Sequence, residues 1–210
     1  MSIIRSWIEA ESATRLELFL REWYGTPTGK PINETLAREI PEPLRRWHEL
    51  YQLWETRITH QNHAIPVNEL APERGKIPFW SENQGNFLWA FDPENPDSKI
   101  YEYQSDNSWR GTHVDISRFL DVSTVNEAAY GSPIKKFFET RDPWNLFFSV
   151  EALQIAPLKL GWPHPESRTV LGSDWLALVD PGLNPGTYEV IIASKSERSL
   201  RKFMPSTQKT

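Results

Sequence analysis

The sequence predicts an α+β protein in which helices pack on an antiparallel β-sheet. The prediction rests first on an aromatic stretch in the middle of the chain that has strand and turn patterning. Segments before and after this stretch have apolar residues at helical spacing. A second strand-turn-strand pattern near the C-terminus predicts a hairpin at about 174–193. The expected sheet combines a central meander, at about 76–103, with this hairpin.

The meander is built around the segment Phe87–Phe91, which is apolar on both faces and therefore resembles a central strand covered on both sides. Aromatic side chains suit such a packed, pleated surface. Asn83–Asn86 supplies turn residues before it, and the two prolines of 92–98 predict a turn after it. The side chains expected in the core are Trp47, Tyr51, Trp54, Trp80, Phe87, Trp89 and Phe91.

Helical spacing appears before the meander in two places. Residues 12–24 form an amphipathic pattern that Gly25 ends. Pro41 and Pro43 open a second helix whose apolar stripe runs on to Ile58, and this helix should lie across the sheet. A short turn is expected between the two, over residues 33–39.

Three further helices are expected after the meander. Asp115 is placed to cap a helix that continues to Tyr130 and ends at Gly131. The apolar and basic mixture of residues 132–141 suggests a short helix, and Ser196 caps a last one with Leu200 and Phe203 turned inward.

The meander also resembles a known family. The segments "ENQG", "FLWAFDPENPD" and "YEY" are similar to the bacterial branch of the SUKH superfamily, which includes a fungal cell-wall synthesis regulator and the Syd protein. "IPEPLRRWHELYQLW" resembles that family's proline-started helix, and "VDISRFL" resembles the helix after its sheet. The resemblance covers about residues 40–130. It suggests one SUKH-like domain over 1–210, with a core at 33–131, an N-terminal helix at 12–24 and a strand-rich extension at 144–205.

This resemblance implies an α+β fold and a non-enzymatic, protein-binding role. Many bacterial members are immunity proteins that bind and neutralise a toxin, often a nuclease. The family offers no catalytic motif to carry over, so no catalytic residue and no cofactor are expected. A regulatory or scaffold protein of the same fold, without a toxin partner, is the first alternative. An enzyme or small-ligand-binding domain that uses the aromatic sheet and its carboxylates is the second.

Composition limits the remaining classes of function. The chain has 210 residues and no cysteine, which excludes disulfides, cysteine zinc sites and thiol nucleophiles. It has neither the apolar core of a signal peptide nor a run long enough to span a membrane, so a cytoplasmic protein is expected. The sequence contains no basic patch with interleaved aromatics, so nucleic-acid binding is not expected.

The distribution of charge suggests a binding surface. The formal net charge is −5, and residues 82–106 alone hold six acids and one base. The rest of the chain holds 22 acids and 22 bases, so the excess lies on the meander. A solvated set of loops is one interpretation; an anionic face for a basic toxin domain is the other. The candidate partner-binding residues are Glu82, Asp92, Glu94, Asp97, Glu102 and Asp106.

Motifs for other chemistry are missing from the sequence. His60 and His63 stand three residues apart, but Pro66 and polar neighbours predict a loop there, and no HExxH pattern is present. No metal site is therefore expected. The sequence also lacks a GxSxG elbow and the glycine-rich loops that hold phosphates.

Overall fold

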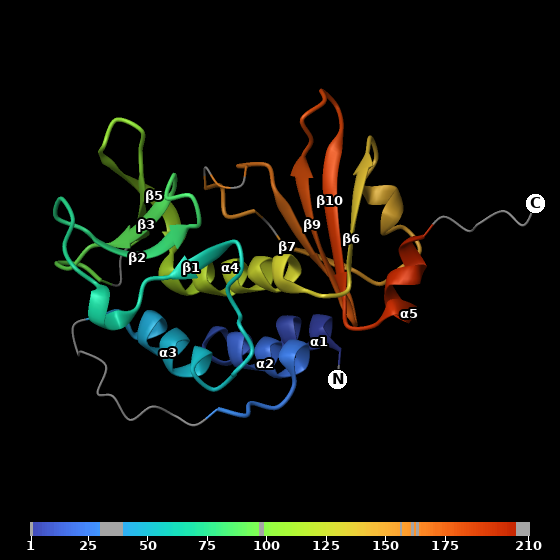
Figure 1. Cartoon of the computed structure of the whole chain (residues 1–210), viewed down its shortest axis with the longest axis horizontal. Helices are drawn as coiled ribbons and strands as arrows, with labels where there is room; N and C mark the ends of the chain where they lie inside the picture. The colour runs from blue at the N-terminus through green and yellow to red at the C-terminus, as the bar shows by residue number, and fades with distance from the viewer. Residues whose placement is uncertain are drawn as a thin grey trace, which may run out of the picture.

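The computed structural model describes residues 2–29, 40–96, 99–155, 157–160, 162 and 164–204. These residues form helices and two five-stranded antiparallel sheets, which confirms the predicted α+β class. The expectation of one sheet is wrong, because the meander and the C-terminal hairpin belong to different sheets (Figure 1). Within the described residues, no helix combines the length and the apolar character that crossing a bilayer requires.

The first sheet is the predicted meander with one added strand on each side. Its order is β1-β2-β3-β4-β5, so β3 is central as expected. The strands are β1 Asn62–Ala64, β2 Ile77–Glu82, β3 Leu88–Phe91, β4 Lys99–Tyr103 and β5 Trp109–Asp115. A register shift between Pro78 and Trp80 marks an irregularity in β2, where the proline cannot donate a hydrogen bond to the ladder.

The second sheet contains the predicted hairpin and three strands that the sequence did not reveal. Its order is β6-β10-β9-β8-β7. The strands are β6 Lys135–Thr140, β7 Leu153–Ile155, β8 Arg168–Leu171, β9 Trp175–Pro181 and β10 Tyr188–Ser194. The short helix expected over residues 132–141 is wrong, since this segment is β6 and pairs with β10 over six residues. Long-range pairing decides its structure, so the strand-rich part begins before residue 144.

The helices follow most of the predicted boundaries. They are α1 Ile3–Glu9, α2 Ser12–Tyr24, α3 Glu42–Tyr51, α4 Ile116–Gly131 and α5 Glu197–Leu200, with short 3-10 turns η1 Val67–Glu69, η2 Trp144–Leu146 and η3 Arg201–Phe203. As predicted, Asp115 caps α4 by accepting a hydrogen bond from the Arg118 N–H at 2.8 Å. Helix α3 ends earlier than its apolar stripe, and α1 was not predicted. The turn expected at 33–39 lies outside the described residues.

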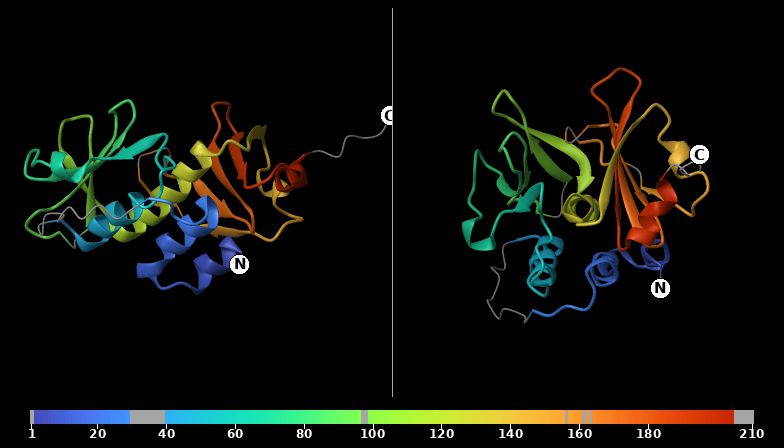
Figure 2. Two further views of the ribbon diagram at one scale, coloured as in Figure 1. Left: turned by 60° about the horizontal axis from the view of Figure 1, so that its bottom comes forward. Right: turned by 45° about the vertical axis from the view of Figure 1, so that its right-hand side comes forward.

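Helix α4 lies at the centre of the arrangement. Figure 2 shows it end-on between the two sheets, while α1, α2 and α3 lie on its other side (Figure 1). It contacts α2, α3, β5, β8, β9 and β10. Its expected inward residues Ile116, Phe119 and Leu120 are buried, and Phe119 contacts the aromatic rings of both β2 and β3.

One hydrophobic cluster runs through both sheets and the helices. It includes Trp89 of β3 and Leu178 of β9. Of the predicted core residues, Tyr51 and Phe87 are only partly buried. The others are buried: Trp47, Trp54, Trp80, Trp89 and Phe91. A second cluster on the opposite face of the second sheet contains Leu200 and Phe203, as predicted for the last helix.

Replacing Trp89 with alanine should lower the free energy of unfolding by about 3–5 kcal/mol, as for other large aromatic side chains in a core. Trp89 is 1% exposed and its ring contacts those of Phe119 and Trp162. Urea unfolding monitored by circular dichroism measures the loss. The control is Phe148→Ala, since Phe148 is 90% exposed and its removal should cost little. Equal losses in the two variants would contradict this view of the core.

Candidate functional site

Two of the predicted partner-binding residues are buried, so their assignment to a contact surface is wrong. Glu82 is 4% exposed and accepts hydrogen bonds from the N–H groups of Gln84 and Asn86, at 2.9 and 3.3 Å, which closes the turn between β2 and β3. Glu102 is 1% exposed, and its carboxylate lies 2.8 Å from the Arg110 guanidinium. Both carboxylates stabilise the sheet.

The other candidates are less uniform than the sequence suggests. Asp92 is half-buried and pairs with the Lys76 ammonium at 2.7 Å, and this hydrogen bond lowers the pKa of the Asp92 carboxyl. Glu94 and Asp106 are exposed. Asp97 lies outside the described residues. Glu94 and Asp106 are thus the two candidates that the structure places fully at the surface.

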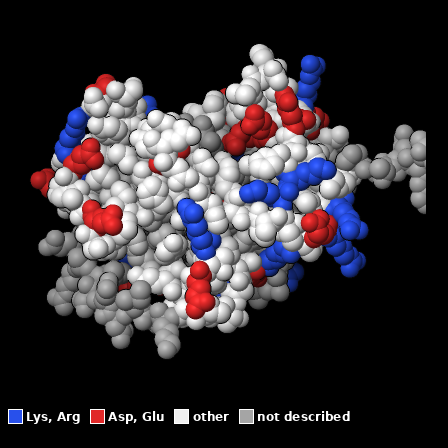
Figure 3. All heavy atoms as spheres, in the orientation of Figure 1, with Lys and Arg blue, Asp and Glu red and all other residues white. Residues whose placement is uncertain are grey.

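The fold brings basic side chains to the acidic stretch. Lys76 and Arg110 lie outside residues 82–106 in sequence but pair with Asp92 and Glu102 across neighbouring strands. Figure 3 shows acidic and basic side chains interspersed over the meander, at the left of the view. A charge count along the sequence therefore overstates the negative charge of this surface.

Glu127 is a buried carboxylate with a structural role. It is fully buried on α4, and its oxygens accept hydrogen bonds from the N–H groups of His60, Gln61 and Asn62 at 2.5, 2.7 and 3.0 Å. The Asn62 amide donates a further one at 2.5 Å. Burial raises the pKa of Glu127, against the opposing effect of these donors. The carboxylate fixes the chain that leads into β1, and both of its oxygens already accept hydrogen bonds from that chain.

A pocket of about 510 Å³ lies between the end of α2, the loop before β1 and the end of α4. Arg57, His60 and Lys195 line it, together with Glu22, and Glu127 does not. Burial, and after it the charges of Arg57 and Lys135, lower the pKa of His60 despite a hydrogen bond to the Arg57 backbone. None of the residues that line this pocket belongs to the strands of the aromatic meander, on which the small-ligand alternative rests.

The two histidines that suggested a metal site do not act together. His60 is half-buried in the loop, whereas His63 is exposed on β1. Throughout the part of the chain that the structure describes, no group of three or more histidine, cysteine or acidic side chains could hold a metal ion. Gly131 fits against the His60 ring so closely that a Cβ there would lie 1.9 Å from Nε2. The histidine is thus packed by the end of α4.

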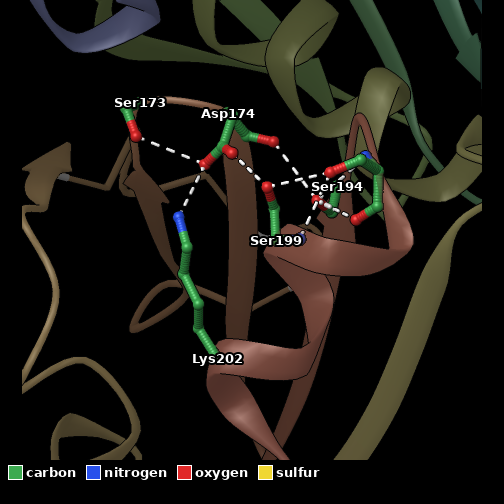
Figure 4. A network of polar contacts seen from close by, with 6 residues as sticks. Ser173, Asp174, Ser194, Ser199 and Lys202 are labelled. Carbon is green, nitrogen blue, oxygen red and sulfur yellow. Dashed lines mark hydrogen bonds and ion pairs between the residues drawn. The ribbon is translucent and has the colours of Figure 1, made fainter.

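Asp174, at the start of the hairpin, is the centre of a polar network (Figure 4). Its carboxylate accepts hydrogen bonds from the hydroxyls of Ser173 and Ser199 and from the Lys202 ammonium. Burial alone would raise the pKa of Asp174, but the hydrogen bonds from Ser199 and Lys202 outweigh it and hold that pKa below its usual value. Ser199 is 3% exposed, and the network attaches α5 to the start of β9.

Large apolar side chains are exposed mainly beside the second sheet. Phe137 is 64% exposed on β6, Trp144 is 43% exposed on η2, and Phe148 is 90% exposed just after it. Leu183, in the turn between β9 and β10, is 93% exposed. Sequence reasoning missed these residues because their apolar character predicts burial. The signal available was the Asp142-Pro143 start of a turn, which places the following aromatics on a surface segment.

Comparisons with known proteins add no relative. No family description, curated protein or solved structure matches the chain. The resemblance of the meander to the SUKH superfamily therefore stays a hypothesis.

Asp121 is a second buried carboxylate on α4. It is 4% exposed, and the Arg15 guanidinium of α2 lies 3.9 Å away. Burial raises the pKa of Asp121 to about 7, and the charge of Arg15 only partly offsets this effect. The folded protein consequently holds a proton on Asp121 at pH values where the unfolded chain has lost it.

Asp121 should contribute a loss of stability as the pH rises from about 4 to about 7, because over this window its carboxyl binds more protons in the folded state than in the unfolded state. Asp121→Asn, which mimics the protonated acid, should remove this loss. Its stability relative to wild type should rise by on the order of 3–4 kcal/mol across the window and stay constant above it. Urea unfolding at a series of pH values measures the difference.

The control for this experiment is Glu94→Gln, which alters an exposed carboxylate and should change the stability little. A stability difference between Asp121→Asn and wild type that does not change between pH 4 and pH 7 would contradict the raised pKa.

Proposed function

We propose that this protein is a non-enzymatic, protein-binding module, and that its contact surface lies on the loop between β6 and β7. The observation that carries the proposal is the exposure of Phe148 and Trp144 on a segment that is otherwise anchored to the core. Aromatic side chains presented in this way are the residue type that dominates binding energy at protein interfaces.

The anchoring of the segment supports this assignment. Phe147, between the two exposed aromatics, is buried and stacks on Trp175 of β9 at a centroid distance of 5.5 Å. The Asp142 carboxylate accepts hydrogen bonds from the N–H groups of Trp144 and Asn145, at 3.1 and 3.2 Å. Because both ends of the turn are held, little conformational entropy is lost when a partner binds.

The kind of partner follows from the family resemblance. An immunity protein of the SUKH type binds a toxin domain, and a nuclease toxin would present a basic face. A scaffold or regulatory role is the alternative for the same fold. Cytoplasmic residence is part of the same proposal, since immunity acts where the toxin does.

A photo-crosslinking amino acid at position 148, introduced in the native host, tests the surface. The captured protein is identified by mass spectrometry, purified and titrated against the wild-type chain by calorimetry. Phe148→Ser and Trp144→Ser should each weaken binding by about tenfold or more. The control is Leu183→Ser, which removes an equally exposed side chain from the turn between β9 and β10. Wild-type affinity in both aromatic variants would contradict the proposed surface.

Growth assays separate the immunity role from the scaffold role. The identified partner, expressed alone, should stop cell growth, and co-expression of the wild-type chain should restore it. Phe148→Ser should restore growth poorly. A partner that is harmless on its own would favour the scaffold alternative.

The acidic turns are tested by the double variant Glu94→Lys, Asp106→Lys. Because the proposed contact lies on the loop between β6 and β7, this reversal should leave the association rate at low salt nearly unchanged. Stopped-flow kinetics measures the rate. A slowdown of about tenfold would instead assign the contact to the meander.

A further inference from the structure

Strand β6 forms one edge of the second sheet. It pairs with β10, and among the described residues no other element makes a backbone hydrogen bond to residues 135–140. An open edge is a template for pairing with another strand. The identity of the strand that fits can be derived from the direction of the backbone groups and from the charges along β6.

The backbone groups of alternate residues face the open edge. The Ile134 carbonyl accepts a hydrogen bond from the Ser194 N–H at 2.9 Å, so residue 134 is turned toward β10. Antiparallel ladders alternate, and residues 136, 138 and 140 are therefore also turned toward β10. The N–H and C=O groups of Lys135, Phe137 and Glu139 point away from it, toward solvent. A new strand would bond these three residues.

The side chains of the same three residues share one face of the sheet, because side chains alternate along a strand. Phe137 is 64% exposed and stands between a positive and a negative residue. The sequence Lys-x-Phe-x-Glu is complementary to itself when it is read in the opposite direction. An antiparallel copy places Phe137 opposite Phe137 and each Lys135 opposite a Glu139.

Glu139 also needs a positive neighbour. Across the sheet it is directly opposite Glu189 of β10, and Glu189 is directly opposite Asp180 of β9. Like charges directly opposite each other are destabilising. Within the chain, Glu139 accepts a hydrogen bond from the neutral amide of Asn184 at 2.8 Å. A lysine on the open side of β6 would compensate this row of carboxylates.

We propose that β6 pairs with β6 of a second copy of this chain, antiparallel, about a two-fold axis at Phe137. The two aromatic rings then form a cross-strand pair with a Lys135–Glu139 ion pair on each side. Lys135 donates to the Tyr130 carbonyl in the single chain, and its ammonium has two further donors for the partner's Glu139.

Other registers of the same pairing are disfavoured. An axis at Lys135 places lysine opposite lysine, and an axis at Glu139 places glutamate opposite glutamate. A two-fold axis at residue 136 or 138 would require N–H and C=O groups that already form hydrogen bonds to β10. The charges on this edge thus select one register, and the two-fold symmetry closes the assembly at a dimer. The dimer does not depend on the proposed partner-binding loop.

Sedimentation equilibrium of the full chain tests the dimer. The wild-type mass should rise with concentration from that of the 24.4 kDa monomer toward twice this value. Lys135→Glu and Glu139→Lys should each weaken dimerisation by about tenfold, and the double variant, which restores opposite charges, should return it to near the wild-type level. Glu151→Lys and Arg198→Glu, which reverse exposed charges on other elements, are the controls and should have little effect.

Phe137→Pro tests the edge directly. The N–H at this position points to the open edge, so proline removes a donor from the dimer ladder and leaves the β6–β10 ladder intact. The variant should be monomeric with an unfolding transition close to that of wild type. If Phe137→Pro fails to fold, the double variant Lys135→Glu, Glu139→Lys decides whether β6 forms the dimer contact.

A wild-type chain that stays monomeric at its highest soluble concentration overturns the proposal. A dimer that persists in folded Phe137→Pro also overturns it, and so does a charge exchange that fails to restore the affinity lost in the single variants.

Discussion

The burial of α4 on several sides at once is the constraint on which the rest of the structure depends. A helix that contacts both sheets and two other helices must satisfy every polar group that it buries. Thr124 accepts a hydrogen bond from the Trp47 indole at 2.9 Å, and Asn126 accepts one from the Thr169 hydroxyl at 2.7 Å. These contacts and the four donors on Glu127 attach α3, the loop before β1 and the second sheet to α4. Burial also raises the pKa of Asp121, another buried acid on this helix.

This use of polar groups changes where a functional surface can lie. Charges that look available in the sequence, such as Glu82 and Glu102, are used to close a turn and to pair with Arg110. The second sheet, by contrast, carries exposed aromatics and a strand edge that pairs with no other strand among the described residues. Features without a structural role in the single chain are the better candidates for contacts with another molecule.

Much of the fold could be predicted because its signals are local. The aromatic alternation around Trp89, the cap at Asp115 and the turns at Asp180-Pro181-Gly182 and Asn184-Pro185-Gly186 each act over a few residues. Strand β6 could not be predicted, because its partner in the ladder lies some fifty residues later and its own pattern fits a short helix equally well. The candidate acidic surface failed for a related reason: Lys76 and Arg110 reach it across strands.

The sequence alone determined the α+β class, the central position of β3 and the burial of its tryptophan, because hydrophobic periodicity and turn chemistry are properties of neighbouring residues. The tertiary structure alone decided that the strands divide into two sheets around α4, which carboxylates are buried and which aromatics are exposed. Strand pairing, ion pairing and burial join residues that are distant in the chain, and their free energies depend on the surroundings that folding creates.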